Sequence, residues 1–246
     1  MIPAYNEQAT IQSLVEQVLE QQPTQLLVVN DASSDKTAAI LQAMEDSLPA
    51  TSPLQIIHND HNLGKAGSLW RGFELAIAQQ MDTVITIDGD GQHRAEDIPA
   101  LLETHLSQPE RLIIGARERN LKTQPLGRFL ANRFANFWIS WASGYGVRDS
   151  QSGFRLYPVA LLKKITALKN SEGFVFESEV IIEAAWQGHY TSVVTIPTIY
   201  HKNRRASHFR PWQDIMKITK MVARRLRIVN FSPRGLFAAI INKAPS

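Results

Sequence analysis

The chain has 246 residues, of which 44% are hydrophobic, and a formal net charge of +3. This length and apolar content predict one compact domain with a sizeable core, and no linker, repeat or low-complexity block divides it. The chain has no cysteine, which excludes disulfides and Cys-ligated zinc and is typical of a cytoplasmic protein. It has no run of about 18 apolar residues, so we predict no transmembrane helix. Residues 1–7 also lack the basic and apolar regions of a signal peptide.

Strands and helices alternate through the first hundred residues. After an apolar start and a helical pattern, residues 26–31 form an apolar run that predicts a buried strand ending in an acid. A helix then runs to about residue 48, with Ser or Thr at its N-cap, and residues 56–59 form a third strand. Another helix begins within residues 62–69, before an apolar strand at 83–87. This alternation predicts a parallel, doubly wound α/β sheet whose strand ends face one crevice.

Two carboxylates follow the fourth strand, in the sequence Asp-Gly-Asp-Gly-Gln-His at 88–93. In a short turn beyond a strand, Asp88 and Asp90 converge on one hard cation, and Gln92 adds a neutral oxygen. Ligands of open α/β sheets bind at this end of the strands. The alternative is a polar turn, because Asp and Gly are common turn residues. His93 is expected to support the site or to begin a helix rather than to bind the metal.

Five motifs occur in order along the chain: Pro-Ala-Tyr-Asn-Glu at 3–7, Val-Asn-Asp-Ala-Ser-Ser-Asp at 29–35, Gly-Lys-Ala-Gly at 64–67, the 88–93 motif, and Asp-Ser-Gln-Ser-Gly-Phe-Arg at 149–155. Together they resemble the family 2 inverting glycosyltransferases of GT-A fold, and especially the dolichyl-phosphate mannosyltransferases and bacterial polyprenyl-phosphate sugar transferases. The resemblance implies a single α/β, Rossmann-like GT-A domain at residues 1–200, with a mostly parallel central sheet flanked by helices. Residues 201–246 would form a basic, helical C-terminal extension of the same unit.

The resemblance also implies roles for single residues on the donor side. The base and ribose of a nucleotide sugar would contact Pro3, Tyr5, Glu7 and Asp31. Other implied contacts with the nucleotide sugar are Lys65, Asp88, Asp149, Ser152, Arg155, Arg204 and Arg205. The metal, Mg²⁺ or Mn²⁺, would bind Asp88, Asp90 and Gln92, so that Asp90 also counts among the catalytic residues.

On the acceptor side, the resemblance places Arg117, just after a strand at 112–115, near an acceptor phosphate. Arg128 or Arg133 would join it from the following helix. An acid of the family lies near Glu177 and Glu179, which with Arg117 complete the expected catalytic residues.

Each role has a structural alternative. Tyr5 fits a half-buried aromatic, Glu7 a favourable first-turn acid, and Lys65 a solvated loop lysine. Arg155 could simply pair with Asp149. Residues that are two positions apart on a helix do not lie on the same face. At most one of Glu177 and Glu179 therefore points into the site, and both could lie on the surface.

The chain departs from the family at two places. The first strand of the family extends several residues before Pro3, whereas only two residues precede it here and cannot form a strand. We therefore expect either that the true start of the chain lies upstream of Met1 or that the domain lacks this core strand. Later, residues 202–208 lack the glycine of the family's Arg-x-x-Gly-x-Ser-Lys loop, and His208 replaces its second lysine.

Positive charge is concentrated near the C-terminus, where residues 201–227 contain nine Lys or Arg and one acid, Asp214. We expect no nucleic-acid partner, because this charge is local and accompanies a predicted metal–diphosphate site. From Pro211 the apolar residues follow a helical stripe, with basic residues elsewhere. Such a helix either lies peripherally on an anionic membrane, where apolar residues of 231–241 would reach the interface, or packs on the sheet with a solvated basic face.

The predicted activity is transfer of a sugar from a GDP- or UDP-sugar to a lipid-linked acceptor, with a polyprenyl phosphate as the first choice, with inversion. A hydroxyl acceptor on a polysaccharide or lipid is the main alternative, and would need Glu177 or Glu179 as a base. A nucleotidyltransferase and a non-catalytic nucleotide-sugar-binding subunit are further alternatives.

Overall fold

The computed structural model describes residues 1–117, 126–170, 175–197 and 211–242, with side chains described outside 126–131, 170 and 211–215. Its strands are β1 (Ile2–Ala4), β2 (Leu26–Asn30), β3 (Leu54–His58), β4 (Thr83–Thr86), β5 (Leu112–Arg117), β6 (Arg155–Pro158) and β7 (Thr191–Ile196). Its helices are α1 (Ile11–Glu20), α2 (Thr37–Ser47), α3 (Gly64–Ala78), α4 (Ile98–Ser107), α5 (Leu126–Ser143), α6 (Val159–Lys164), α7 (Val175–Trp186), α8 (Pro211–Ile228) and α9 (Pro233–Ile241), with short 3₁₀ turns at Ala95–Asp97 and Thr166–Asn170.

Two sheets form the centre of the molecule. Strands β1, β2 and β3 are parallel, whereas β6 lies antiparallel between β4 and β5, and β7 pairs in parallel with β5. Met1 connects the sheets: its amino group donates to the Ile85 carbonyl at 2.7 Å, and Ile87 N–H donates to the Met1 carbonyl at 3.0 Å. The predicted alternation of strands and helices is therefore confirmed, as is the α/β class with a parallel sheet, while the antiparallel β6 was not anticipated.

The first strand is short but present. Three residues pair with β2 in the register Ile2↔Val28 to Ala4↔Asn30, because the strand continues through Pro3 and Ala4. The expectation that two residues before Pro3 leave this strand absent is therefore wrong. Pairing with β2 places the loop after β1 beside the loops that follow the neighbouring strands.

The apolar pattern explains how helices cover these sheets. All five residues of β2 are buried, as expected of a strand covered on both faces. Helix α1 buries Ile11, Leu14, Val15 and Val18, a stripe with helical spacing. The N-cap prediction for α2 is wrong: no Ser or Thr caps it, and the Asp35 carboxylate accepts from Thr37 N–H at 2.9 Å instead.

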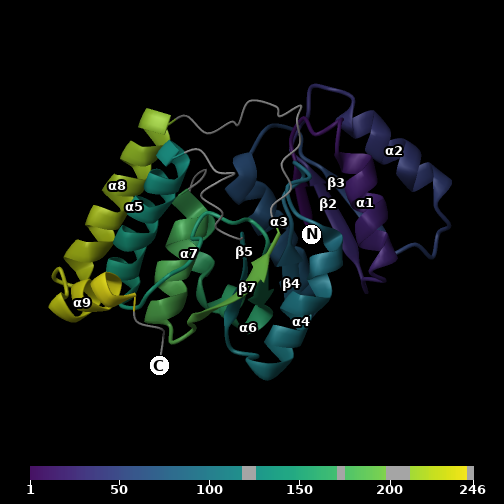
Figure 1. Cartoon of the computed structure of the whole chain (residues 1–246). Coiled ribbons are helices and arrows are strands. Elements are labelled where there is room, and N and C mark those ends of the chain that lie inside the picture. Colours follow the sequence, from purple (N-terminus) through teal and green to yellow (C-terminus); the bar gives the residue numbers. More distant parts are fainter. Residues whose placement is uncertain (118–125, 171–174, 198–210, 243–246) are drawn as a thin grey trace.

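Helices α5, α7, α8 and α9 lie together at one end, away from β1–β3, α1 and α2 (Figure 1). The interior of α8 contains Ile218, Met221, Val222 and Leu226, and this helix packs against α5 and α7 rather than against the sheet. Helix α9 packs against α5. No helix within the described ranges is both long enough and apolar enough to cross a bilayer.

Candidate active site

The loops after β1 and β2 are joined by hydrogen bonds. Asn6 adopts a left-handed backbone conformation, with φ of 58°, which Asn tolerates better than most residues. Its side-chain oxygen accepts from Ser34 N–H at 2.7 Å and from Asp35 N–H at 3.2 Å, and its own N–H donates to the Ser33 hydroxyl at 2.9 Å. These bonds fix the backbone next to Tyr5 and Glu7, two of the expected nucleotide contacts.

Asp31, at the end of β2, organises the next loop. Its carboxylate is buried and accepts from Asn59 at 2.7 Å and from Leu63 N–H at 2.8 Å. Leu63 directly precedes α3, so Asp31 sets where this helix begins. Both hydrogen bonds go to the same carboxylate oxygen, Oδ1. The expected contact of Asp31 with a ribose remains a prediction.

Lys65 and Asp88 form the centre of the site. The Lys65 ammonium, on the first turn of α3, lies 2.6 Å from Asp88 Oδ1 and 3.1 Å from Glu177 Oε1 on α7. Burial disfavours the charged lysine, but the two carboxylates outweigh it and raise the pKa of Lys65. Burial likewise opposes ionisation of Asp88, yet Lys65 and other cations lower its pKa. The interpretation of Lys65 as a solvated loop lysine is therefore wrong.

Two glycines allow the 88–93 turn to touch distant segments. A Cβ atom at position 153 would lie 2.3 Å from Asp88 Oδ2, so the carboxylate rests directly on the Gly153 backbone. The Thr86 hydroxyl fixes this approach by donating to the Gly153 carbonyl at 2.8 Å. A Cβ atom at Gly89 would meet Glu7 Cγ at 3.1 Å and the Pro3 carbonyl at 3.2 Å. The first, fourth and fifth motifs of the sequence therefore meet at this turn.

Asp90 lies in the same turn in a different electrostatic state. Burial, and then the charge of Asp88, raise the pKa of Asp90. Gln92 donates to this carboxylate from its backbone at 3.0 Å and also from its side-chain amide. In the described part of the chain no three His, Asp or Glu side chains gather into a metal site, so the available donors are two carboxylates and the Gln92 amide oxygen. Such an all-oxygen set suits Mg²⁺ or Mn²⁺, and a cation would relieve the repulsion between the two acids.

Arg117 and Asp149 form a second charged pair. Arg117 ends β5, and its Nε and Nη2 donate to the Asp149 carboxylate at 3.0 and 2.8 Å, while its backbone N–H donates to Oδ2 at 3.0 Å. Asp149 has φ of 44°, an uncommon conformation that such a network stabilises. Burial opposes both charges, but the pairing lowers the pKa of Asp149 and raises that of Arg117. The alternative pairing of Asp149 with Arg155 is wrong.

Arg155 and Ser152 are buried beneath the site. The Arg155 guanidinium donates to the backbone carbonyls of Ser150, Ser152 and Glu177 at 2.7 to 2.8 Å. The Ser152 hydroxyl donates to the Gly115 carbonyl at 2.6 Å. Both side chains are at most 1% exposed, and they fix the 149–155 segment to β5 and α7. Their expected contact with the nucleotide sugar stays a prediction.

The two acids of α7 point to different neighbours. Glu177 contacts Lys65, whereas Glu179 Oε1 lies 3.7 Å from Arg225 Nη2 on α8. Both are buried, so a surface location is wrong for each, and Glu177 is the acid that faces the charged centre. Arg133 is exposed on α5. The side chain of Arg128, together with Arg204 and Arg205 and the rest of the 202–208 loop, lies outside the described residues.

Sequence reasoning underestimated two residues. His93 is 4% exposed, its ring packs 5.4 Å from that of Phe154, and its Nδ1 has no hydrogen-bond partner in the described part of the structure. Burial lowers the pKa of His93. Gly153 was noted only as part of a motif, and its position against Asp88 is visible only in the fold.

The fold and this cluster define a class of protein. Residues 1–166 match the family described as Glycosyl transferase family 2, and the chain belongs to this family of sugar-transferring enzymes.

Relatives and solved structures agree with this assignment. The chain is 27% identical, over 81% of its length and 84% of the relative's, to the UDP-N-acetylglucosamine–dolichyl-phosphate N-acetylglucosaminyltransferase of Methanococcus voltae. It is 28% identical to the polyprenol monophosphomannose synthase of Mycolicibacterium smegmatis, over 81% of this chain and 76% of that one. Its fold resembles glucosyl-3-phosphoglycerate synthase from Mycobacterium tuberculosis, solved with Mn²⁺, uridine diphosphate and product, with a TM-score of 0.66, 20% identity and coverage of 92% and 76%.

Proposed function

We propose that this protein transfers a sugar from a nucleoside diphosphate sugar, a GDP- or UDP-sugar, to a polyprenyl phosphate, with inversion at the sugar carbon. The names of the relatives support a lipid-phosphate acceptor. The observation that carries the proposal is the meeting of two charged groups of residues, the Lys65–Asp88–Glu177 cluster and the Arg117–Asp149 pair, at the ends of β4 and β5. The first suits a diphosphate with its cation, and the second suits a further phosphate.

On the donor side, we propose that Asp88, Asp90 and Gln92 bind Mg²⁺ or Mn²⁺. The metal would supply a Lewis acid that neutralises the leaving diphosphate. Lys65 adds a fixed ammonium beside Asp88, within reach of the same charge. The loops after β1 and β2, with Pro3, Tyr5 and Glu7, would hold the nucleoside, since hydrogen bonds through Asn6 fix them before a ligand arrives.

On the acceptor side, Arg117 would bind the phosphate. Asp149 occupies its Nε and Nη2, which orients the guanidinium plane and leaves Nη1 for a phosphate oxygen. A phosphate monoester has a second pKa of about 6 and is largely ionised at neutral pH, so it attacks without a general base. Glu177 is already paired with Lys65, which makes it less suited to the base that a hydroxyl acceptor requires.

The C-terminal helices belong to the same unit in this proposal. Helices α8 and α9 pack against α5, and Arg225 of α8 pairs with Glu183 of α7 at 2.7 Å. Residues 201–246 would therefore complete the domain of residues 1–200 rather than fold separately.

A transfer assay tests the proposed function. UDP-N-acetylglucosamine, UDP-glucose and GDP-mannose are each incubated with a short, water-dispersible polyprenyl phosphate and with the matching polyprenol, with Mn²⁺ or Mg²⁺. Sugar transfer to the phosphate alone, with release of nucleoside diphosphate and an inverted anomeric signal by NMR, is the expected result. Transfer to the polyprenol would establish the hydroxyl alternative. Release of sugar 1-phosphate, with the nucleoside monophosphate joined to the acceptor, would indicate a nucleotidyltransferase. No product with any donor would contradict both enzymatic proposals.

A further inference from the structure

Exposed apolar side chains are concentrated at the end of the molecule formed by α5, α8 and α9. Of the ten large apolar residues exposed in the described structure, seven lie in these helices or the turn between α8 and α9, which indicates a surface of its own: Phe134, Met216, Ile228, Phe231, Phe237, Ile240 and Ile241. Exposed apolar residues grouped in this way mark an interaction surface more often than scattered ones do.

Close contacts fix the inner side of helix α9 against the rest of the protein, so the same residues always form its outer face. A Cβ atom at Gly235 would lie 2.6 Å from the Trp141 carbonyl, and one at Gly146 would lie 2.7 Å from the backbone of Asn242. The Trp141 indole N–H also donates to the Ser232 carbonyl at 3.0 Å. With this inner side against α5, the residues Phe237, Ile240 and Ile241, spaced three and four apart, share the outer face and are 50 to 66% exposed.

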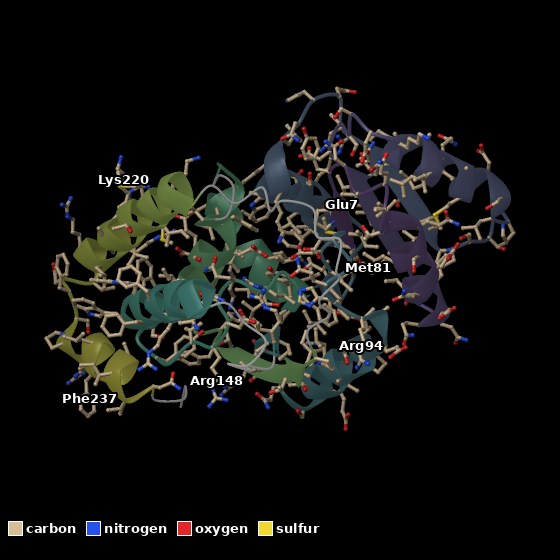
Figure 2. The ribbon with its side chains drawn as sticks, turned by 45° about the horizontal axis from the view of Figure 1, so that its top comes forward. Glu7, Met81, Arg94, Arg148, Lys220 and Phe237 are labelled. Carbon is tan, nitrogen blue, oxygen red and sulfur yellow. The ribbon has the colours of Figure 1, made fainter. Side chains whose placement is uncertain are left out.

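The outer face of α8 is basic. Lys217, Lys220, Arg224 and Arg227 recur at helical spacing on the side opposite the buried apolar residues, and all are exposed. Arg225 points inward instead, to Glu183 and over the ring of Trp186 at 5.1 Å. Helix α8 contains one acid, Asp214, and residues 216–242 contain no Asp or Glu, so basic residues outnumber acids across α8 and α9. Lys220 and Phe237 both lie at the outer edge of this end (Figure 2).

We propose that this end of the molecule docks on an anionic membrane surface, through an α8–α9 surface made of the basic residues at 217, 220, 224 and 227 and the apolar residues at 237, 240 and 241. Lys and Arg side chains near an anionic leaflet are attracted to its negative charge, and apolar side chains that enter the leaflet add a hydrophobic contribution. The proposal rests on the proposed function, because a polyprenyl phosphate acceptor resides in a membrane. A second copy of the chain fits this surface less well, since a two-fold contact would bring like charges together.

Vesicle co-sedimentation tests the surface directly. Vesicles of phosphatidylcholine alone are compared with vesicles containing 30% phosphatidylglycerol, a fraction chosen as roughly that of an anionic membrane surface. We expect binding to the anionic vesicles only, and its loss in 0.5 M KCl, a salt concentration at which charges are screened within about 5 Å. A variant with Phe237→Ser, Ile240→Ser and Ile241→Ser should bind about tenfold more weakly, and a Lys217→Glu, Lys220→Glu variant should bind weakly as well.

Matched controls are available elsewhere on the surface. Leu106→Ser removes an apolar residue of α4 that is 81% exposed, and Lys163→Glu reverses an exposed charge on α6; both variants should bind as the unchanged protein does. Circular dichroism and thermal melting check that every variant is folded. Equal binding to both vesicle types, equal binding by the triple serine variant, or a stable dimer by sedimentation velocity that this variant abolishes would overturn the proposal.

The vesicle experiment and the transfer assay fail independently. Vesicle binding requires no substrate, so binding to anionic vesicles without sugar transfer would support the membrane-docking surface and contradict the proposed polyprenyl phosphate acceptor. Conversely, the triple serine variant should keep its activity on a short, water-dispersible polyprenyl phosphate and lose activity on the same head group embedded in vesicles.

Discussion

The two halves of the site are held together by different forces. At the ends of β1 and β2, hydrogen bonds to the Asn6 amide oxygen and to the Asp31 carboxylate fix the loops to one another, and we call this the hydrogen-bonded half. At the ends of β4 and β5, ion pairs predominate, with Lys65 between Asp88 and Glu177 and with Arg117 on Asp149. In the first half, hydrogen bonds fix the positions of the loops. In the second half, a charged ligand is able to displace one member of an ion pair and take its place.

This difference has a physical cause. Hydrogen bonds are short-ranged and directional, so those of the hydrogen-bonded half set the geometry of the loops. Partly buried charges are costly without partners, and in the absence of a ligand they pair with one another. Substitutions in the half held by ion pairs should therefore affect turnover most, and substitutions in the hydrogen-bonded half should affect stability most.

The largest effect is expected from the two acids of the 88–93 turn. Asp88→Asn or Asp90→Asn should lower turnover by about a thousandfold, because a metal supplies several kcal/mol of charge stabilisation at a leaving group. The fold should survive, since Asn matches Asp in shape. Turnover and Mn²⁺-dependent nucleotide binding are measured, with exposed Asp82→Asn as the matched control. Near-normal activity of both variants, or activity unaffected by excess EDTA, would contradict the metal assignment.

Gly153→Ala should reduce turnover by about ten- to a hundredfold with little loss of stability. The new methyl group would overlap the Asp88 carboxylate, which must move away, and a displacement of about 1 Å at a reacting site has this effect on rate. A double variant with Asp88→Asn separates the causes. If Gly153→Ala acts through Asp88, the double variant should be scarcely slower than Asp88→Asn alone.

Arg117→Lys should raise the KM for polyprenyl phosphate about tenfold and leave donor affinity almost unchanged. Lysine keeps the charge but loses the planar fork that contacts Asp149 and a phosphate together. Arg234→Lys, at an exposed position on α9, is the matched control. Equal weakening of donor and acceptor would place Arg117 at the diphosphate instead.

In the hydrogen-bonded half, Asn6→Ala should lower the free energy of unfolding by about 1–2 kcal/mol, because two backbone N–H groups lose their acceptor and alanine tolerates a positive φ poorly. Asn6→Gly keeps the backbone freedom and removes only the acceptor, so its loss should be smaller. Chemical denaturation measures both. No change in either variant would show that the loops do not depend on these bonds.

The smallest effect concerns pH. Burial raises the pKa of Asp149, but the pairing with Arg117 outweighs it and keeps this pKa in the folded protein below its ordinary value of 3.8. The stabilisation is therefore present above pH 3.8 and is lost as the pH falls through the lower folded value. Asp149→Asn should be less stable than the unchanged protein at pH 7, and this difference should narrow below about pH 4. A difference that stays constant across this range would contradict the pairing.

The sequence by itself determined the local and periodic features of this protein. Apolar runs predicted β2 and β4 within a residue or two. Strand β2 is buried on both faces, which requires a continuous apolar run, whereas β4 alternates between buried and half-buried residues. The position of Asp88 and Asp90 after a strand also followed from the sequence, since chain order places them there.

Only the tertiary structure decided which distant residues became partners. Asp149 is six residues from Arg155 but pairs with Arg117, because the left-handed turn at Asp149 directs its carboxylate to the end of β5 while β6 carries Arg155 into the interior. The sequence alone does not distinguish Glu177 from Glu179. In the fold, Glu177 of α7 pairs with Lys65 of α3, and Glu179 lies near Arg225 of α8. Such pairings depend on the crossing of elements far apart in the chain, which no local pattern encodes.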